Sequence, residues 1–277
     1  MSVLIVGLGE VGSALYRIFQ ERYKGPTYGY DIDPAKSIHT LDEIPSPIDY
    51  LHIAIPFSSL NQFVDVVDNY VRRFQPRMIF IHSTVAIGTT RRVYERVGRP
   101  VVYTPIRGKH PNLYRHILFW PKWVSALPLK DDVLEEARKH LESVGLNVKI
   151  CMSSPESLEL AKLWETVYRA IMIASWQELH RVALKYGADL SVIAEFIAEV
   201  HRVLHDRPVY YPDVIGGHCL IPNTKILNEC YPSKLFEFVL ESNELRKKEI
   251  EDPEVRKGID VVKRVYEALT NRDYFGM

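Results

Sequence analysis

Three glycines near the start of the chain have a spacing that suits the binding of a phosphate group. Gly7, Gly9 and Gly12 follow the apolar run Val3–Val6 and precede a segment with helical spacing at residues 13–19. In such a strand–turn–helix unit the glycines permit a tight turn, close approach of a pyrophosphate, and close helix packing. The N–H groups at the start of the helix then point at the phosphates. The pattern predicts a dinucleotide site, and the same turn also contains Leu8, Glu10 and Val11.

An acidic residue follows where it would discriminate between dinucleotides. A second strand, Thr27–Tyr30, ends at Asp31, about twenty residues after Gly12. A carboxylate there accepts hydrogen bonds from the ribose hydroxyls and would repel a 2′-phosphate, which predicts NAD rather than NADP. The glycine spacing alone is also compatible with a turn of another α/β fold, but the strand context and Asp31 favour the dinucleotide interpretation.

A second group of reactive residue types lies at Gly216-Gly217-His218-Cys219. The glycine pair shapes a loop that presents the thiol. A neighbouring histidine and the N-terminus of a following helix could lower the pKa of that thiol and make it a nucleophile. The alternative is a buried, unreactive cysteine, which is a common state of free thiols.

A polar stripe interrupts a long apolar segment. Lys162, Thr166 and Arg169 are spaced i, i+4 and i+7, so in a helix they share one face. The structural alternative is that Lys162 pairs with Glu159 or Glu165 at three-residue spacing. Spacing alone leaves both interpretations open.

The first half of the chain alternates strand and helix patterns, which predicts a Rossmann-type doubly wound α/β domain over residues 1–152. Further strands are expected at residues 50–55, 78–82, 101–103, 122–127 and 147–150, and further helices at 60–74, 88–97 and 132–144. Pro56, Ser83 and Thr84 end two of these strands and are assigned to the cofactor site. A long basic and aromatic loop at 105–121 is either a ligand loop or a solvated surface loop.

The second half predicts an all-helical domain over residues 153–277, organised around one long helix at 155–186. This helix is apolar on nearly every side, so we expect a partner subunit to cover it and form a homodimer. Shorter helices are expected at 190–203, 233–248 and 253–270.

Composition limits the classes of function. The 35 basic and 35 acidic residues balance, which argues against binding to nucleic acid or an anionic membrane. We expect a cytoplasmic protein because neither a transmembrane run nor a signal peptide is recognisable and the three cysteines are widely spaced. His201 and His205 lie one helical turn apart without a third ligand at suitable spacing, so no metal site is predicted.

Taken together, the motifs make the chain similar to the UDP-glucose/GDP-mannose dehydrogenase family over about residues 1–240. The blocks that carry the resemblance are Gly7-x-Gly9-x-x-Gly12, Tyr28-Gly29-Tyr30-Asp31-Ile32-Asp33, Ser83-Thr84-Val85-x-x-Gly88-Thr89-Thr90, Ala161-Lys162-Leu163, Gln177-Glu178-Leu179, Gly216-Gly217-His218-Cys219 and Asn223-Thr224. The resemblance implies NAD-dependent oxidation of a sugar-nucleotide alcohol to a carboxylate by a dimeric enzyme. It implies that Cys219 forms a thiohemiacetal and then a thioester, that Lys162 stabilises the oxyanion, and that Thr84 positions a catalytic water.

The chain also departs from the family pattern. Family members have a third, nucleotide-binding domain that this sequence does not reach. The glutamate of their Ser-Pro-Glu block is Ile106 in Thr104-Pro105-Ile106, Thr166 replaces an asparagine, and Asn223 replaces an aspartate. The loss of carboxylates would weaken general-base steps more than hydride transfer.

Three hypotheses follow. The first is an NAD-dependent alcohol oxidoreductase of this superfamily with Cys219 and Lys162 at its active site, joined by His218, Asn223, Thr166 and Thr84. The second is a two-electron dehydrogenase of the β-hydroxyacid type, which uses a lysine on the long helix and needs no cysteine. The third is a catalytically silent NAD-binding module. The partner expected for the enzyme, besides NAD, is a small-molecule substrate, with a nucleotide sugar as the candidate.

Overall fold

The computed structural model describes residues 1–270, which divide into two compact units. The first unit runs from Met1 to Lys162, and the second begins at Leu163. The predicted domain boundary at residues 152–153 stays a prediction. The last seven residues of the predicted helical domain, 271–277, lie outside the described residues.

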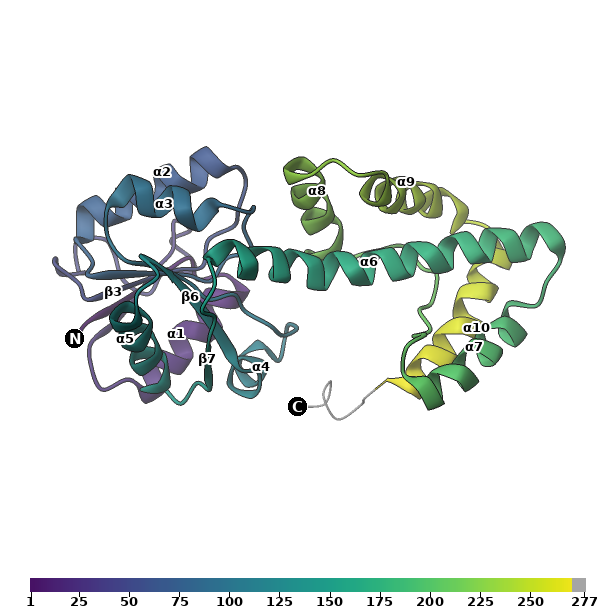
Figure 1. The fold of residues 1–277 in the computed structure, drawn as a ribbon, viewed down its shortest axis with the longest axis horizontal. Coiled ribbons are helices and arrows are strands. Elements are labelled where there is room, and N and C mark those ends of the chain that lie inside the picture. Colours follow the sequence, from purple (N-terminus) through teal and green to yellow (C-terminus); the bar gives the residue numbers. More distant parts are fainter. Residues whose placement is uncertain (271–277) are drawn as a thin grey trace. The chain divides into compact units, whose positions relative to one another are not determined.

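A seven-stranded sheet is the centre of the first unit (Figure 1). Its strands are β1 Val3–Val6, β2 Thr27–Tyr30, β3 Tyr50–Ile53, β4 Met78–Ile81, β5 Val101–Tyr103, β6 Lys122–Leu127 and β7 Val148–Ile150. They are ordered β2-β1-β3-β4-β5-β6-β7, and every neighbouring pair is parallel except β5 with β6. The strand order reverses beside β1, and doubly wound sheets bind ligands outside the carboxyl ends of strands at such a point. The predicted fold class is confirmed.

Both faces of the sheet are covered because its central strands are apolar on both sides. The covering helices are α1 Glu10–Arg22, α2 Leu60–Phe74, α3 Thr89–Val97, α4 Leu113–Phe119 and α5 Asp131–Glu142. Within β1, Val3 and Ile5 belong to one buried cluster, together with residues of α1, α4 and α5. Leu4 and Val6 belong to the other, together with residues of α2 and α3. Figure 1 shows the same division, with α2 and α3 on one side of the sheet and α1, α4 and α5 on the other.

Helix α4 is an element that the sequence analysis placed inside a loop. Residues 105–121 contain this short helix because Leu113, His116 and Ile117 are spaced i, i+3 and i+4 and are all buried. Arg107 further ties the segment together by donating a hydrogen bond to the carbonyl oxygen of Pro121 (2.6 Å). The expectation of one long loop was therefore wrong, since Leu113 and Ile117 pack into the buried cluster that contains residues of α1, and this burial outweighs the polar composition of the segment.

The part of the chain that follows the sheet is helical among the described residues. Its elements are α6 Pro155–Tyr186, α7 Leu190–Leu204, α8 Leu220–Cys230, α9 Lys234–Glu249 and α10 Pro253–Leu269. The bounds of α6 agree with the prediction: proline occupies its first position, and Gly187 ends it in a left-handed conformation at φ +63°. Helix α7 packs on α10, and α8 packs on α9.

Helix α6 keeps large apolar side chains exposed, as its apolar sequence suggested. Those on its length are Leu160, Trp164, Tyr168, Val182, Leu184 and Tyr186. The homodimer inferred from this pattern stays a prediction. Among residues 1–270, no helix combines the length and the apolar character needed to cross a membrane.

Candidate functional site

The glycine turn after β1 has a geometry that excludes side chains at two of its three glycines. Gly7 has φ +87°, and a Cβ there would lie 2.7 Å from the carbonyl oxygen of Ala54. A Cβ on Gly12 would lie 1.6 Å from the carbonyl oxygen of Gly7, so α1 can approach the turn only without a side chain at this position. These two glycines therefore fix the turn itself, as their spacing predicted.

Gly9, unlike Gly7 and Gly12, has room beside it, and this open space indicates where a ligand fits. A Cβ built on Gly9 would meet no described atom within 4 Å. Gly9 precedes the first residue of α1, Glu10, and no described side chain caps the N–H groups that begin this helix. Open space beside uncapped N–H groups at a helix N-terminus fits a pyrophosphate. The residues present therefore fit a dinucleotide.

Asp31 lies against the glycine turn at the end of β2. Its Oδ2 accepts a hydrogen bond from the backbone N–H of Leu8 (2.6 Å), and its Oδ1 accepts one from Asp33 (2.8 Å). A carboxylate oxygen has capacity for further hydrogen bonds, so the ribose hydroxyls of a dinucleotide could still bind here. Its negative charge would oppose a 2′-phosphate.

The other residues predicted to bind the cofactor follow the neighbouring strands. Pro56 is exposed shortly after β3, and Ser83 and Thr84 lie just past the end of β4. The hydroxyl of Ser83 donates to the carbonyl oxygen of Ile55 (2.6 Å), which ties the ends of the two strands together. These residues share the edge of the sheet at which the strand order reverses.

Lys122, which the sequence analysis did not single out, is buried at this edge. Its Nζ donates to the carbonyl oxygens of Thr104 (2.5 Å) and Pro105 (3.0 Å) just past the end of β5. Burial lowers the pKa of Lys122 well below its ordinary value, and the positive charges of Lys162 and Arg107 lower it further. A single lysine at the start of a strand is usually a surface charge, so no signal in the sequence marks it.

Lys162 is half-buried on α6 and is thus an electrostatic neighbour of the buried Lys122. The carboxylate of Glu159, one of its two suggested partners, accepts hydrogen bonds from Gly88 (2.6 Å) and Thr90 (2.8 Å) at the start of α3. Glu159 therefore serves to join α6 to α3. The role of Lys162 stays a prediction.

The cysteine loop leads directly into α8. Cys219 is the residue before the helix and its side chain is exposed, as is that of His218. One turn later, Asn223 donates a hydrogen bond from its Nδ2 to the hydroxyl of Thr166 on α6 (2.8 Å). The structure thus brings together two predicted site residues that are far apart in the sequence. Their catalytic roles stay predictions.

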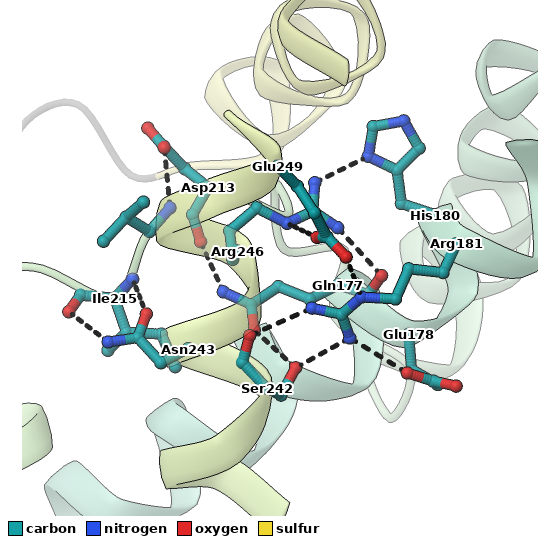
Figure 2. A network of polar contacts seen from close by, with 11 residues as sticks. Gln177, Glu178, His180, Arg181, Asp213, Ile215, Ser242, Asn243, Arg246 and Glu249 are labelled. Atoms are coloured by element: carbon teal, nitrogen blue, oxygen red, sulfur yellow. Dashed lines mark hydrogen bonds and ion pairs between the residues drawn. The ribbon is translucent and has the colours of Figure 1, made fainter. Parts of the chain in front are cut away.

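The segment before the cysteine loop is fixed by two amide side chains (Figure 2). Gln177 on α6 donates to the carbonyl oxygen of Asp213 (2.7 Å). The oxygen of Asn243 on α9 accepts from the backbone N–H of Ile215 (2.7 Å) in the protein interior. The chain is therefore anchored immediately before Gly216, which leaves the two glycines and the thiol to extend from a fixed point.

A buried cation holds these helices together (Figure 2). The guanidinium of Arg246 is fully buried and donates to the carbonyl oxygen of Gln177 (3.0 Å). It also lies 3.0 Å from the Nδ1 of His180 and 3.1 Å from a carboxylate oxygen of Glu249. Because a buried charge needs such partners, this network sets how α9 packs on α6.

Residues 1–270 contain no group of three or more His, Cys, Asp or Glu side chains that could hold a metal ion. The rings of His201 and His205 lie 6.0 Å apart, edge to face.

Comparison with known proteins identifies the relatives of this chain. Residues 156–244 match the central domain of the UDP-glucose/GDP-mannose dehydrogenase family. A UDP-glucose 6-dehydrogenase of Campylobacter jejuni is 25% identical over 297 residues, which cover 90% of this chain and 73% of that protein. The predicted resemblance to this family is therefore confirmed.

Solved structures share the fold. A UDP-D-ManNAc dehydrogenase of Pyrococcus horikoshii superimposes with a TM-score of 0.74 at 18% identity, covering 88% of this chain and 68% of that one. A 3-hydroxyisobutyrate dehydrogenase of Mycobacterium tuberculosis superimposes with a TM-score of 0.65 at 15% identity, covering 95% of this chain and 98% of that one. The fold and the relatives thus define the class of protein, a dehydrogenase with a Rossmann-type domain. Within that class the chain is similar to the UDP-glucose/GDP-mannose dehydrogenase family.

Proposed function

We propose that this protein is an NAD-dependent dehydrogenase that oxidises the CH–OH group of a nucleotide sugar. The observation that supports it most is the glycine turn, in which Gly9 leaves open space before the uncapped start of α1 and Asp31 accepts a hydrogen bond from Leu8 of the same turn, where its carboxylate would meet the ribose. The names of the relatives support the substrate class, since the Campylobacter protein acts on UDP-glucose. When bound, NAD would accept the hydride, and the protein would bind and orient both reactants.

Two side chains carry the proposed chemistry on the substrate. The thiol of Cys219 would attack the aldehyde formed in a first oxidation, and His218 is its neighbour in the same exposed loop. The ammonium of Lys162 would stabilise the negative charge that develops on the substrate oxygen. Thr84 would position the attacking water, and the contact between Asn223 and Thr166 would support the loop that holds the thiol.

A two-electron reaction is the second candidate, and a specific feature favours it. The position of the relatives' glutamate is occupied by Ile106, which is buried and cannot act as a base for thioester hydrolysis. A dehydrogenase of the β-hydroxyacid type stops after one hydride transfer and requires no thiol. The third hypothesis, a silent NAD-binding module, would leave the cofactor site intact without turnover.

Thermal unfolding of the purified protein with candidate ligands tests the proposal. A ligand at 100 times its dissociation constant adds about 2.7 kcal/mol to the free energy of unfolding. We expect NAD⁺ to raise Tm more than NADP⁺, and a UDP- or GDP-sugar to raise it further in the presence of NAD⁺. Stabilisation by small hydroxyacids in place of nucleotide sugars would favour the second candidate. A protein unaffected by NAD⁺ would contradict the cofactor assignment.

A further inference from the structure

The carboxylate of Glu159 is a buried charge that caps a helix distant in the sequence. Glu159 lies on α6 and is 0% exposed. Its Oε2 accepts a hydrogen bond from the backbone N–H of Gly88 (2.6 Å). Its Oε1 accepts from the backbone N–H of Thr90 (2.8 Å) and from the hydroxyl of Thr90 (2.7 Å). Gly88 is the N-cap residue of α3 and has no side chain to cap the helix, so a residue 71 positions later supplies the acceptor.

Three donors thus converge on the two oxygens of one carboxylate. The first N–H groups of a helix have no partner within the helix, and its N-terminus attracts negative charge. Burial raises the pKa of Glu159, but the hydrogen bonds from Thr90 and Gly88 oppose this rise. A glutamine is of nearly the same size and has a single oxygen, so at this position it would leave one of the two backbone N–H groups without an acceptor.

The loop between β4 and α3 carries two residues of the candidate cofactor site, Ser83 and Thr84. At its start, the hydroxyl of Ser83 donates to the carbonyl oxygen of Ile55 (2.6 Å), and Val85 is fully buried. At its end, the loop meets the N-terminus of α3, which Glu159 binds. Thr84 is half-buried between two fixed residues. Its position therefore depends on how both ends of this loop are held.

The same carboxylate also fixes the start of α6. Lys162 follows Glu159 by three residues on this helix, so the two side chains leave it on the same side. Leu158 packs into the buried cluster that contains Val85, which docks the start of α6 on the first unit. Apolar burial is not directional, whereas hydrogen bonds to two N–H groups of a helix fix a direction. Glu159 therefore sets the rotation of α6 at the turn that carries Lys162.

We propose that Glu159 is a positioning residue of the candidate active site, which holds Lys162 in register with Thr84 through its cap on α3. The inference rests on the dehydrogenase function proposed above, in which Lys162 stabilises the charge that develops on the substrate oxygen. A displacement of about 1 Å at a reacting group can lower the rate about 10²-fold. The cap also gives a role to Gly88-Thr89-Thr90, the end of the sequence block that begins at Ser83.

A second link between the same two helices provides a matched control. Glu156 on α6 accepts a hydrogen bond from the Nε of Arg91 on α3 (2.6 Å). Their side chains are 24% and 46% exposed, respectively, so this ion pair contributes little to stability. The pair joins two side chains, whereas Glu159 binds the backbone at which the loop ends. If docking of α6 on α3 were all that mattered, loss of either link would have a similar effect.

NMR of the backbone amides tests the positioning without any need for activity. In Glu159→Gln we expect hydrogen exchange at Gly88 or Thr90 to be about tenfold faster or more, because one N–H loses its acceptor. The order parameter of the Thr84 amide should fall as the loop loosens. Glu156→Gln should leave both quantities as in the wild type. An unchanged order parameter of Thr84 in folded Glu159→Gln would overturn the proposal.

A double-mutant cycle then connects Glu159 to Lys162. The measured quantity is the single-turnover rate of the first NADH formation with the substrate that the ligand screen identifies. We expect Glu159→Gln to lower this rate about tenfold, with the dissociation constant of NAD⁺ unchanged. In the Lys162→Met background the same change should cost less than about twofold, because no ammonium remains to be misplaced. An equal loss in both backgrounds would show a merely structural role and overturn the proposal.

Thr90→Val tests the cap from its other side, even if Glu159→Gln does not fold. Valine keeps the shape of threonine and removes the hydroxyl that donates to Glu159. We expect the order parameter of Thr84 and the single-turnover rate to fall together, with a smaller loss of rate than in Glu159→Gln. Wild-type values of both would overturn the proposal. If the wild-type protein forms no NADH, the proposed function is contradicted, and the amide measurements still decide whether Glu159 positions the loop.

Discussion

Cys219 and Cys230 lie at opposite ends of α8, and both are exposed, which makes them a matched pair for testing thiol chemistry. If the thiol of Cys219 attacks an aldehyde, Cys219→Ala should abolish or stall turnover while NAD⁺ binding is retained. Cys230→Ala should keep the wild-type kcat. Steady-state kinetics of both variants measure this, and unchanged kinetics in Cys219→Ala would remove that residue from the mechanism and favour a two-electron reaction.

Lys162 offers a second test at the scale of one side chain. Lys162→Met preserves most of the apolar stem but removes the positive charge, so kcat should fall by about 10² if the ammonium stabilises an oxyanion. Lys185→Met changes an exposed lysine in the last turn of the same helix and should have little effect. The comparison requires a substrate identified by the ligand screen. Full activity of Lys162→Met would show that this lysine has only a structural role.

The glycine turn makes a prediction at the scale of an element. Gly9→Ala adds a methyl group to open space, so the free energy of unfolding should change by less than about 1 kcal/mol while NAD⁺ binding is lost. Gly12→Ala forces the methyl group against the carbonyl oxygen of Gly7, so it should lower stability by several kcal/mol. Urea unfolding and NAD⁺ titration separate the two effects. Equal NAD⁺ affinity in Gly9→Ala and the wild type would contradict the pyrophosphate site.

Local signals explain which elements could be predicted from the sequence. The limits of α6 follow from its proline at the start and Gly187 at the end, and β1 follows from four consecutive buried apolar residues. Helix α4 was missed because its basic and aromatic composition resembles a loop, and its burial depends on contacts with α1 that no local pattern contains.

The site shows the same division between local and tertiary information. The glycine turn and Asp31 are recognisable because a phosphate-binding turn needs fixed spacing. The contacts of the buried His52 with His82 and His140 are not recognisable in the sequence, since these residues are far apart along the chain and only the sheet and α5 bring their rings together. The lowered pKa of Lys122 likewise depends on the folded protein, in which the side chain is buried and its Nζ donates to two carbonyl oxygens.

At the scale of the whole molecule, buried neutral histidines predict sensitivity to acid. Burial lowers the pKa of His140 to about 3 and of His180 to about 4, and lowers those of His52 and His82 well below the ordinary value. An unfolded histidine has a pKa of about 6.5, so below that pH the unfolded chain binds more protons than the folded one. The free energy of unfolding should therefore fall as the pH drops from 6.5 toward the folded values.

Each such histidine contributes up to about 1.4 kcal/mol per pH unit to this loss. Urea unfolding between about pH 7 and pH 5 measures the slope above the range in which most carboxylates titrate. His140→Gln should reduce the slope, whereas His110→Gln, which changes an exposed histidine, should leave it unchanged. A stability that is constant over this range would contradict the burial of neutral imidazoles.

The formation of NADH tests the central proposal most directly. Purified protein is incubated with NAD⁺ and each of a set of UDP-sugars, GDP-sugars and small hydroxyacids, and NADH is counted against the alcohol consumed. We predict NADH with at least one nucleotide sugar, and two NADH per sugar if Cys219 carries the second oxidation. A protein that binds NAD⁺ but forms no NADH with any alcohol in the set would contradict the assignment as a nucleotide-sugar dehydrogenase.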